Sequence, residues 1–207
     1  VEDIHFGGNL GNLRLRGKSS KGTALNSDSG CSKIEFTTEN SPVDCTGDIR
    51  TLIDYENYAD VSTKDAMFRS VFYKNKELKT APKHPATTLA SYCYYEVFSG
   101  CTALETAPEL PATTLADGCY SEMFSGCTAL GTAPDLPAET LAPYCYQCMF
   151  KNCSALQSVR IKAKPVFDTQ EEEYLSFQII EYANCFDRWL DGAGSDNRKI
   201  YCYQEFY

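Results

Sequence analysis

Apolar residues in the middle of the chain recur with a period of 26 residues. Residues 87–112 and 113–138 have nearly the same sequence, and the equivalent residues Leu104 and Leu130 are 26 positions apart. A fixed period of this length is typical of solenoids, in which each unit buries its apolar face on its neighbours. The pattern predicts a right-handed solenoid of about four coils over residues 53–161. We expect its ladders of equivalent residues to face inward: Leu78, Leu104, Leu130 and Leu156; Phe72, Phe98, Phe124 and Phe150; Cys101, Cys127 and Cys153.

One half of each repeat predicts a short helix. Between Leu115 and Leu130 the apolar residues are one, three or four positions apart, which places them on a single helical face. Asp117 precedes this run as a candidate N-cap, and Gly126 stands near its end, where helices commonly stop. A helix of about two turns is marginal alone, so it depends on the neighbouring coils.

The other half of the repeat predicts a short extended segment. Residues 105–112 contain Pro108 and Pro111, and proline cannot donate a hydrogen bond to a sheet ladder. We therefore expect one extended segment around Thr106 and an irregular turn after it. In a stack these segments lie side by side as a parallel sheet, about 4.8 Å apart.

The N-terminal part of the chain differs from the repeats. Residues 13–16 and 33–37 alternate with period two, as half-buried strands do. Residues 1–52 therefore predict a β-rich N-terminal module or cap. The repeat that follows it is degenerate, with Met67 in place of a cysteine and Asn75 in place of the next one.

The C-terminal part also departs from the pattern, as terminal repeats usually do. After the solenoid of residues 53–162, residues 163–207 predict a mixed C-terminal cap. An acidic helix start at residues 168–173 and a final strand at residues 199–207 are its expected elements.

Charge removes several classes of partner. The formal net charge is −9 and the isoelectric point is about 4.8. Nucleic-acid binding needs a basic stripe, which the sequence lacks, and the same acidity argues against an anionic membrane surface. No apolar run approaches the roughly 18 residues of a membrane span. The sequence does not open with the charged and apolar regions of an export signal.

Six of the eleven cysteines fall on two ladders of equivalent positions, Cys93/Cys119/Cys145 and Cys101/Cys127/Cys153. Cysteine packs as a small hydrophobe, so we expect these six to be reduced core residues. Any disulfide is expected among the five other cysteines: Cys31, Cys45, Cys148, Cys185 and Cys202.

Cys145 and Cys148 form a CxxC pair, which is compatible with redox or zinc chemistry. No second pair follows it, and Cys145 already belongs to a ladder. A bridge from Cys148 to the C-terminal cap, with Cys185 as partner, is the favoured alternative.

The sequence offers no catalytic set. Its two histidines, His5 and His84, stand outside any metal-binding or nucleophile motif. We expect no enzyme activity and no cofactor. Two groups of residues are candidates for ligand binding. The first is one repeat position whose charge changes along the stack, occupied by Lys83, Glu109 and Asp135. The second is three tyrosines that lie outside the ladder of Tyr94, Tyr120 and Tyr146, namely Tyr92, Tyr95 and Tyr144.

The motif MFSGCTAL at residues 123–130 resembles the AFxxCxxL core of the BspA-like (treponeme-type) leucine-rich repeat surface proteins. Phe124, Cys127 and Leu130 match directly, Met123 stands for the alanine, and two other repeats match in the same way. The resemblance implies an α/β leucine-rich-repeat solenoid at the cell surface or in the extracellular space. It implies adhesion to host proteins or to other bacteria, and it supplies no catalytic residues.

Two functions remain open at this point. The first is a binding module that presents a repeat face to a protein or glycan. The second is a structural spacer or a component of a larger surface assembly, bacterial or viral. Screening against proteins and glycans separates the two.

Overall fold

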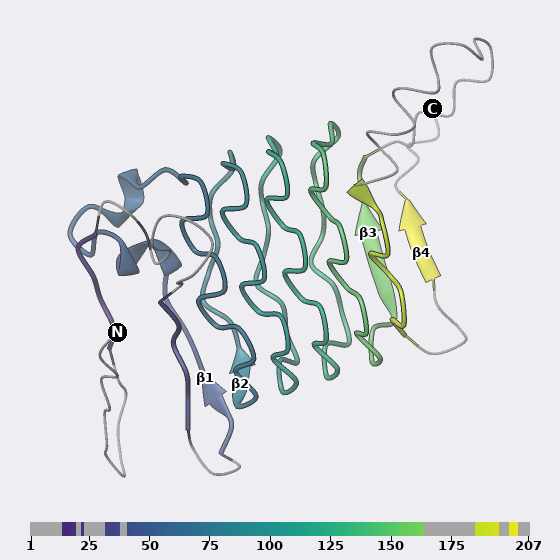
Figure 1. Ribbon diagram of the computed structural model, residues 1–207, viewed down its shortest axis with the longest axis horizontal. Helices are drawn as coiled ribbons and strands as arrows, with labels where there is room; N and C mark the ends of the chain where they lie inside the picture. The colour runs from purple at the N-terminus through teal and green to yellow at the C-terminus, as the bar shows by residue number, and fades with distance from the viewer. Residues whose placement is uncertain are drawn as a thin grey trace.

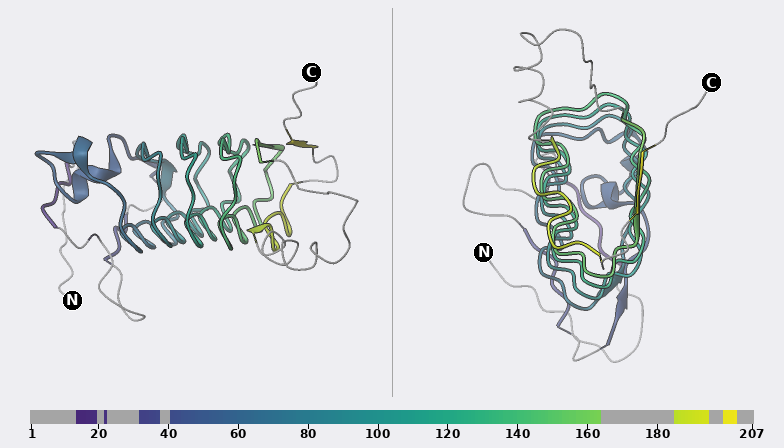
Figure 2. Two further views of the ribbon diagram at one scale, coloured as in Figure 1. Left: turned by 90° about the horizontal axis from the view of Figure 1, so that it is seen from above. Right: turned by 90° about the vertical axis from the view of Figure 1, so that its right-hand side faces the viewer.

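The described part of the chain winds into coils that stack side by side along one axis. The structure, a computed structural model, describes residues 14–19, 22, 32–37, 41–163, 185–194 and 199–202, the last four without their side chains. Figure 1 shows the coils in a row from the N-terminal to the C-terminal end. Figure 2, seen along that row, shows that they superimpose on one oval outline. The two long sides of the oval are built differently.

One long side, the strand face, comprises residues 78–84, 104–112, 130–138 and 156–162. Single parallel bridges join the threonines of successive coils, Thr80 to Thr106 and Thr106 to Thr132, and Thr132 to Ser158 beyond them. This confirms the expected extended segment at Thr106. Its regular strands are β1 (Val43–Asp44), β2 (Leu78–Thr80), β3 (Ser158–Ile161) and β4 (Lys199–Cys202), with β1 parallel to β2 and β3 parallel to β4.

Strand β4 confirms the expected final strand over residues 199–202, while residues 203–207 lie outside the described part. The middle of the strand face stays irregular because Pro108 and its equivalents provide no N–H for a longer ladder. Two short 3-10 helices, η1 (Ile49–Leu52) and η2 (Tyr58–Asp60), precede the first complete coil.

The opposite long side, the turn face, comprises residues 64–76, 90–102, 116–128 and 142–154. The prediction of a helix at residues 115–130 is wrong, because this segment consists mostly of consecutive tight turns. Asp117 is correspondingly not a helix cap, and its backbone carbonyl accepts a hydrogen bond from the N–H of Tyr92 at 2.9 Å.

Backbone hydrogen bonds on the turn face alternate between two partners. The N–H of Tyr95 donates to the carbonyl of Tyr92, three residues back, at 3.1 Å. The N–H of Glu96 donates instead to the carbonyl of Ser121 in the next coil, also at 3.1 Å. From Tyr92 to Cys101 every N–H follows one of these two courses. The face therefore leaves none of these donors unsatisfied, although it is neither helix nor sheet.

Every fourth residue of the turn face has a left-handed backbone. In one coil these residues are Tyr92 (φ 53°), Glu96 (φ 54°) and Gly100 (φ 76°). This conformation costs an L-residue about 1–2 kcal/mol. It recurs at the equivalent positions of the other coils: Ala66, Ser70 and Lys74; Gly118, Glu122 and Gly126; Tyr144, Cys148 and Asn152.

The expected leucine, phenylalanine and cysteine ladders are buried, and this part of the prediction is confirmed. Phe98, Phe124 and Phe150 are all 0% exposed. Their rings stack along the axis, with centroids 5.6 Å apart for Phe98 and Phe124 and 5.7 Å apart for Phe124 and Phe150. The core is therefore one continuous column that runs through all the coils.

The cysteine ladder also makes hydrogen bonds. The thiol of Cys127 donates to the backbone carbonyl of Phe98 in the preceding coil at 3.1 Å, and Cys153 does the same to Phe124 at 3.0 Å. In the first coil Asn75 takes this place. Its side-chain amide donates to the carbonyl of Ile34 at 3.0 Å, which ties residues 32–37 to the stack.

The N-terminal segments cover the first coil without forming the strands expected there. Residues 32–37 are not a regular strand, and their backbone is joined to the first coil through the N–H of Ile34, which donates to Val71 at 2.7 Å. Residues 14–19 contribute one antiparallel bridge, from Lys18 to Asp54. Leu13 lies outside the described residues.

Residues 185–194 continue the turn face beyond the last repeat. The N–H groups of Cys148 and Phe150 donate to Asp187 and Trp189, and Arg188 and Gly192 have the left-handed backbone of the earlier coils. This segment therefore adds part of a further coil, which the sequence pattern did not reveal. The expected helix start at residues 168–173 lies outside the described part of the chain.

Candidate binding surface

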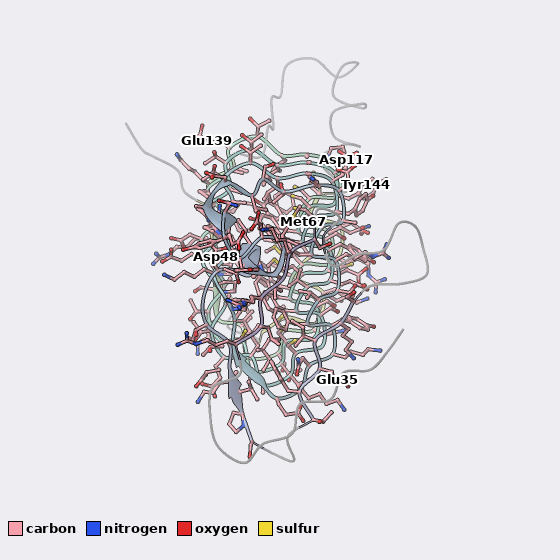
Figure 3. The ribbon with its side chains drawn as sticks, turned by 90° about the vertical axis from the view of Figure 1, so that its left-hand side faces the viewer. Glu35, Asp48, Met67, Asp117, Glu139 and Tyr144 are labelled. Carbon is pink, nitrogen blue, oxygen red and sulfur yellow. The ribbon has the colours of Figure 1, made fainter. Side chains whose placement is uncertain are left out.

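Two exposed tyrosines share one position on the turn face. Tyr92 is 43% exposed and Tyr144 is 38% exposed, and the residue between them in the stack is Gly118. The ring of Tyr92 lies over this glycine, because a Cβ atom there would be only 2.3 Å from Cε1 of the tyrosine. Figure 3 places Tyr144 beside Asp117 at the outer corner of the turn face. The two rings thus form one outward-facing column.

Tyr95 joins this column to polar groups. Its ring lies 6.0 Å from that of Tyr92 in an edge-to-face arrangement, and the guanidinium of Arg69 lies 5.0 Å from its centroid. Its hydroxyl donates to the carboxylate of Glu122 in the next coil at 3.2 Å. Burial and the two nearby carboxylates, Glu96 and Glu122, raise the pKa of this phenol, so the hydroxyl keeps its proton and donates.

Glu96 and Glu122 occupy equivalent positions in adjacent coils. Glu96 accepts a hydrogen bond from the Ser70 hydroxyl at 3.1 Å. Partial burial raises the pKa of its carboxyl, and the neighbouring carboxylate of Glu122 adds to the rise. The turn face therefore combines flat aromatic rings with hydrogen-bond acceptors, an arrangement suited to sugar rings and to polar peptide surfaces.

The strand face carries a shallow depression of about 480 Å³. It is lined by prolines and threonines of two coils and includes Glu109 and Asp135. Ion pairs between coils neutralise most of the charges around the strand face. Lys79 pairs with Glu105 at 3.3 Å, Arg160 with Asp135 at 3.9 Å and Lys162 with Glu139 at 2.6 Å.

The structure divides the predicted binding residues between the two faces. Tyr92 and Tyr95 come together on the turn face, with Tyr144 two coils further along. Glu109 and Asp135 share the depression on the strand face, and Lys83 is exposed one coil before them. The six residues therefore do not form a single site.

Sequence reasoning missed Arg69, Glu96 and Glu122 as neighbours of the tyrosines. A signal for them exists in the repeat register. Arg69 and Tyr95 are 26 positions apart, as are Glu96 and Glu122. Residues at the same repeat position stack directly, so side-chain pairs between coils can be read from this spacing.

The CxxC pair does not form a two-thiol site. Cys145 is fully buried, whereas Cys148 is part-exposed on the turn face. The expected disulfide between Cys148 and Cys185 is wrong, since both are thiols. Cys185 continues the ladder of Cys145 instead, with a hydrogen bond between the two thiols, and it donates to the carbonyl of Ala142 at 2.9 Å. Among the described residues no three His, Cys, Asp or Glu side chains are grouped to hold a metal ion.

The chain matches no protein-family model, no curated protein and no solved structure. Within the described residues, no helix is both long enough and apolar enough to span a bilayer.

Proposed function

We propose that the protein is a non-enzymatic binding protein of the cell surface or extracellular space, built as a leucine-rich-repeat solenoid. It recognises a protein or a glycan through its turn face. The observation that carries the proposal is the column of Tyr92 and Tyr144 with Tyr95 beside it. Tyrosine is enriched in interfaces because it combines a large apolar ring with a hydroxyl.

The turn face is a better candidate than the strand face. Of the described residues, four large hydrophobic side chains are exposed, and two of them are Tyr92 and Tyr144. The strand face contributes none of the four, and its inter-coil ion pairs already use most of its charges. Exposed ion pairs contribute little to association, because water and salt screen them.

Paired variants test the proposal. Wild-type protein is screened on protein and glycan arrays, and hits are compared for the double variants Tyr92→Ala/Tyr144→Ala and Glu109→Ala/Asp135→Ala. We expect the tyrosine variant to weaken binding by at least about tenfold, as loss of aromatic anchors does. The acidic variant should stay within about twofold. The reverse order would assign recognition to the strand face.

A structural spacer is the second candidate. It is favoured by the unbroken core column and by bonding that continues from residues 43–49 to residues 185–194. Such a stack holds two attached parts at a fixed separation. If arrays give no hit that depends on either face, the spacer function is the better explanation.

A further inference from the structure

The two middle coils of the turn face carry negative charge without a balancing cation. Residues 90–102 and 116–128 contain the carboxylates of Glu96, Asp117 and Glu122 but no lysine or arginine. None of these carboxylates takes part in the ion pairs found among the described residues. Around the strand face, by contrast, three acidic residues pair with cations of neighbouring coils. Uncompensated acidity is therefore concentrated on the turn face.

Glu96 and Glu122 lie at equivalent positions of adjacent coils and repel each other. Partial burial raises the pKa of Glu96, and the charge of Glu122 raises it further, although the Ser70 hydroxyl and Arg69 act in the opposite direction. Water screens partly buried charges less than it screens fully exposed ones. A cation beside the two carboxylates would therefore remove an unfavourable interaction as well as add a favourable one.

An arginine of the chain itself shows how this face holds a cation. The guanidinium of Arg69 lies 5.0 Å from the ring centroid of Tyr95, within the range of a cation–π contact. The neighbouring ring of Tyr92 is 43% exposed and lies 6.0 Å from that of Tyr95. No described cation lies over Tyr92. The face therefore offers a second ring of the kind that Arg69 already contacts.

Carboxylates lie on both sides of this ring. The ring of Tyr92 lies over Gly118, which follows Asp117 in the chain, and Figure 3 places Asp117 at the outer corner of the turn face. On the other side, the hydroxyl of Tyr95 donates to Glu122 in the adjacent coil at 3.2 Å. Aromatic rings and carboxylates are thus neighbours on one continuous surface.

We propose that the turn face binds an arginine-bearing segment of a partner protein. One guanidinium stacks on Tyr92 beside Asp117, and a second is held by Glu96 and Glu122. A guanidinium suits both parts of the surface, because it stacks on aromatic rings and donates paired hydrogen bonds to carboxylates.

This partner deepens the proposed function and rests on it, because the turn face is taken as the recognition surface. Of the two classes left open there, protein and glycan, the charge favours a protein. A neutral sugar leaves the carboxylates uncompensated, and an anionic sugar is repelled by them. A basic protein segment is complementary to them.

Fluorescence anisotropy with an arginine peptide tests the proposal. The probe is a labelled peptide of alternating arginine and glycine, and its matched control has glutamine in place of arginine. At physiological ionic strength, wild-type protein should bind the arginine peptide saturably. It should bind the glutamine peptide at least about tenfold more weakly, because hydrogen bonds between charged groups are lost.

Charge-matched variants separate a site from general attraction to an acidic protein. Glu96→Gln/Glu122→Gln should weaken binding of the arginine peptide by at least about tenfold. Glu109→Gln/Asp135→Asn removes the same number of charges from the strand face and should stay within about twofold. Tyr92→Ala should weaken binding by about two- to fivefold, the usual size of an exposed cation–π contact.

Three results would overturn the proposal. The first is the absence of saturable binding of the arginine peptide to the wild type. The second is equal binding of the arginine and glutamine peptides. The third is an equal loss of affinity in the two charge-matched variants, which would mean general attraction without a site.

The proposed function itself fails on a different result. Array targets that depend on Tyr92 and Tyr144, but that the arginine peptide does not displace, would contradict the arginine-bearing partner and leave the proposed function in place. Array targets that bind independently of both tyrosines would contradict the proposed function.

Discussion

His84 shows how a single residue departs from its repeat. The equivalent residues of the next two coils are Leu110 and Leu136, and all three side chains are buried. Burial lowers the pKa of the imidazole to about 4, although its hydrogen bond to Pro82 and the charge of Asp48 act in the opposite direction. The imidazole therefore stays neutral in the folded chain at pH values below about 6.5, where the histidine of the unfolded chain becomes protonated.

This histidine makes the stability of the fold depend on pH. Its contribution is complete above pH 6.5 and is lost as the pH falls toward 4, by about 3 kcal/mol in total. Urea unfolding at pH 7, 5.5 and 4 should show this loss in the wild type. His84→Leu, which copies the later coils, should remove the part of the loss that comes from His84. Equal pH dependence of the unfolding free energy in the wild type and in His84→Leu would contradict the assignment.

The cysteines should differ strongly in reactivity. Burial raises the pKa of Cys101, Cys119 and Cys153 to about 12 and that of Cys45 to about 11, while Cys148 is only part-buried and shows a smaller rise. Alkylation requires an accessible thiolate. Among the cysteines whose side chains the structure describes, iodoacetamide should label Cys148 first and Cys45 next in native protein at pH 8, and the ladder cysteines only after unfolding. Peptide mass spectrometry measures this order, and early labelling of Cys119 or Cys127 would show that the coils open locally.

At the scale of the element, the sequence predicts the extended segment correctly and the helix incorrectly. Prolines restrict the backbone and threonines favour extended conformations, so the extended segment around Thr106 was predicted correctly. Apolar spacings of one, three and four fit both a helix and this turn face. The distinguishing signal is the strict period of four, with buried pairs at Cys93–Tyr94 and Val97–Phe98. A helix repeats every 3.6 residues and drifts away from such a pattern.

The candidate surface was predictable only in part, for a related reason. Tyr92 and Tyr144 lie outside the ladder of buried tyrosines, and their place there was visible in the sequence. The carboxylates beside Tyr95, those of Glu96 and Glu122, were not recognised, because a helical interpretation does not bring these residues of adjacent coils together. The C-terminal continuation through Phe186 was missed because residues 164–184 interrupt the 26-residue register.

The left-handed positions of the turn face predict a stabilising substitution. Ala66 has φ 54°, which costs an alanine about 1–2 kcal/mol, whereas glycine adopts it freely. The greater freedom of glycine in the unfolded chain offsets about 0.4–1 kcal/mol of this gain. Ala66→Gly should therefore raise the unfolding free energy by about 0.5–1 kcal/mol. The control Ala129→Gly, at a residue outside the left-handed set, should lower it by a similar amount.

At the scale of the whole molecule, coils communicate only with their neighbours. Phe124 is fully buried and stacks on the rings of both adjacent coils. In a one-dimensional stack of this kind, stability is a sum of coil terms and nearest-neighbour interfaces. Damage at one interface therefore divides the molecule into two weakly coupled parts.

Phe124→Ala should cost about 3–5 kcal/mol, the usual range for a large aromatic residue removed from a core. It should also separate unfolding into two transitions, which hydrogen exchange resolves as different protection on the two sides of the substitution. Tyr58→Ala is the control, because Tyr58 is 40% exposed and its loss should cost less than about 0.5 kcal/mol. A cost below about 1 kcal/mol for Phe124→Ala would mean that the ring is peripheral.

The hydrogen bonds between coils all run along the axis of the stack, and this has a mechanical consequence. A pull on the two ends loads all the boundaries in series, so the weakest boundary opens first and the others follow one at a time. Each coil of 26 residues then releases about 90 Å of extended chain. A tether built in this way yields stepwise under tension and lengthens many-fold before it is fully unravelled.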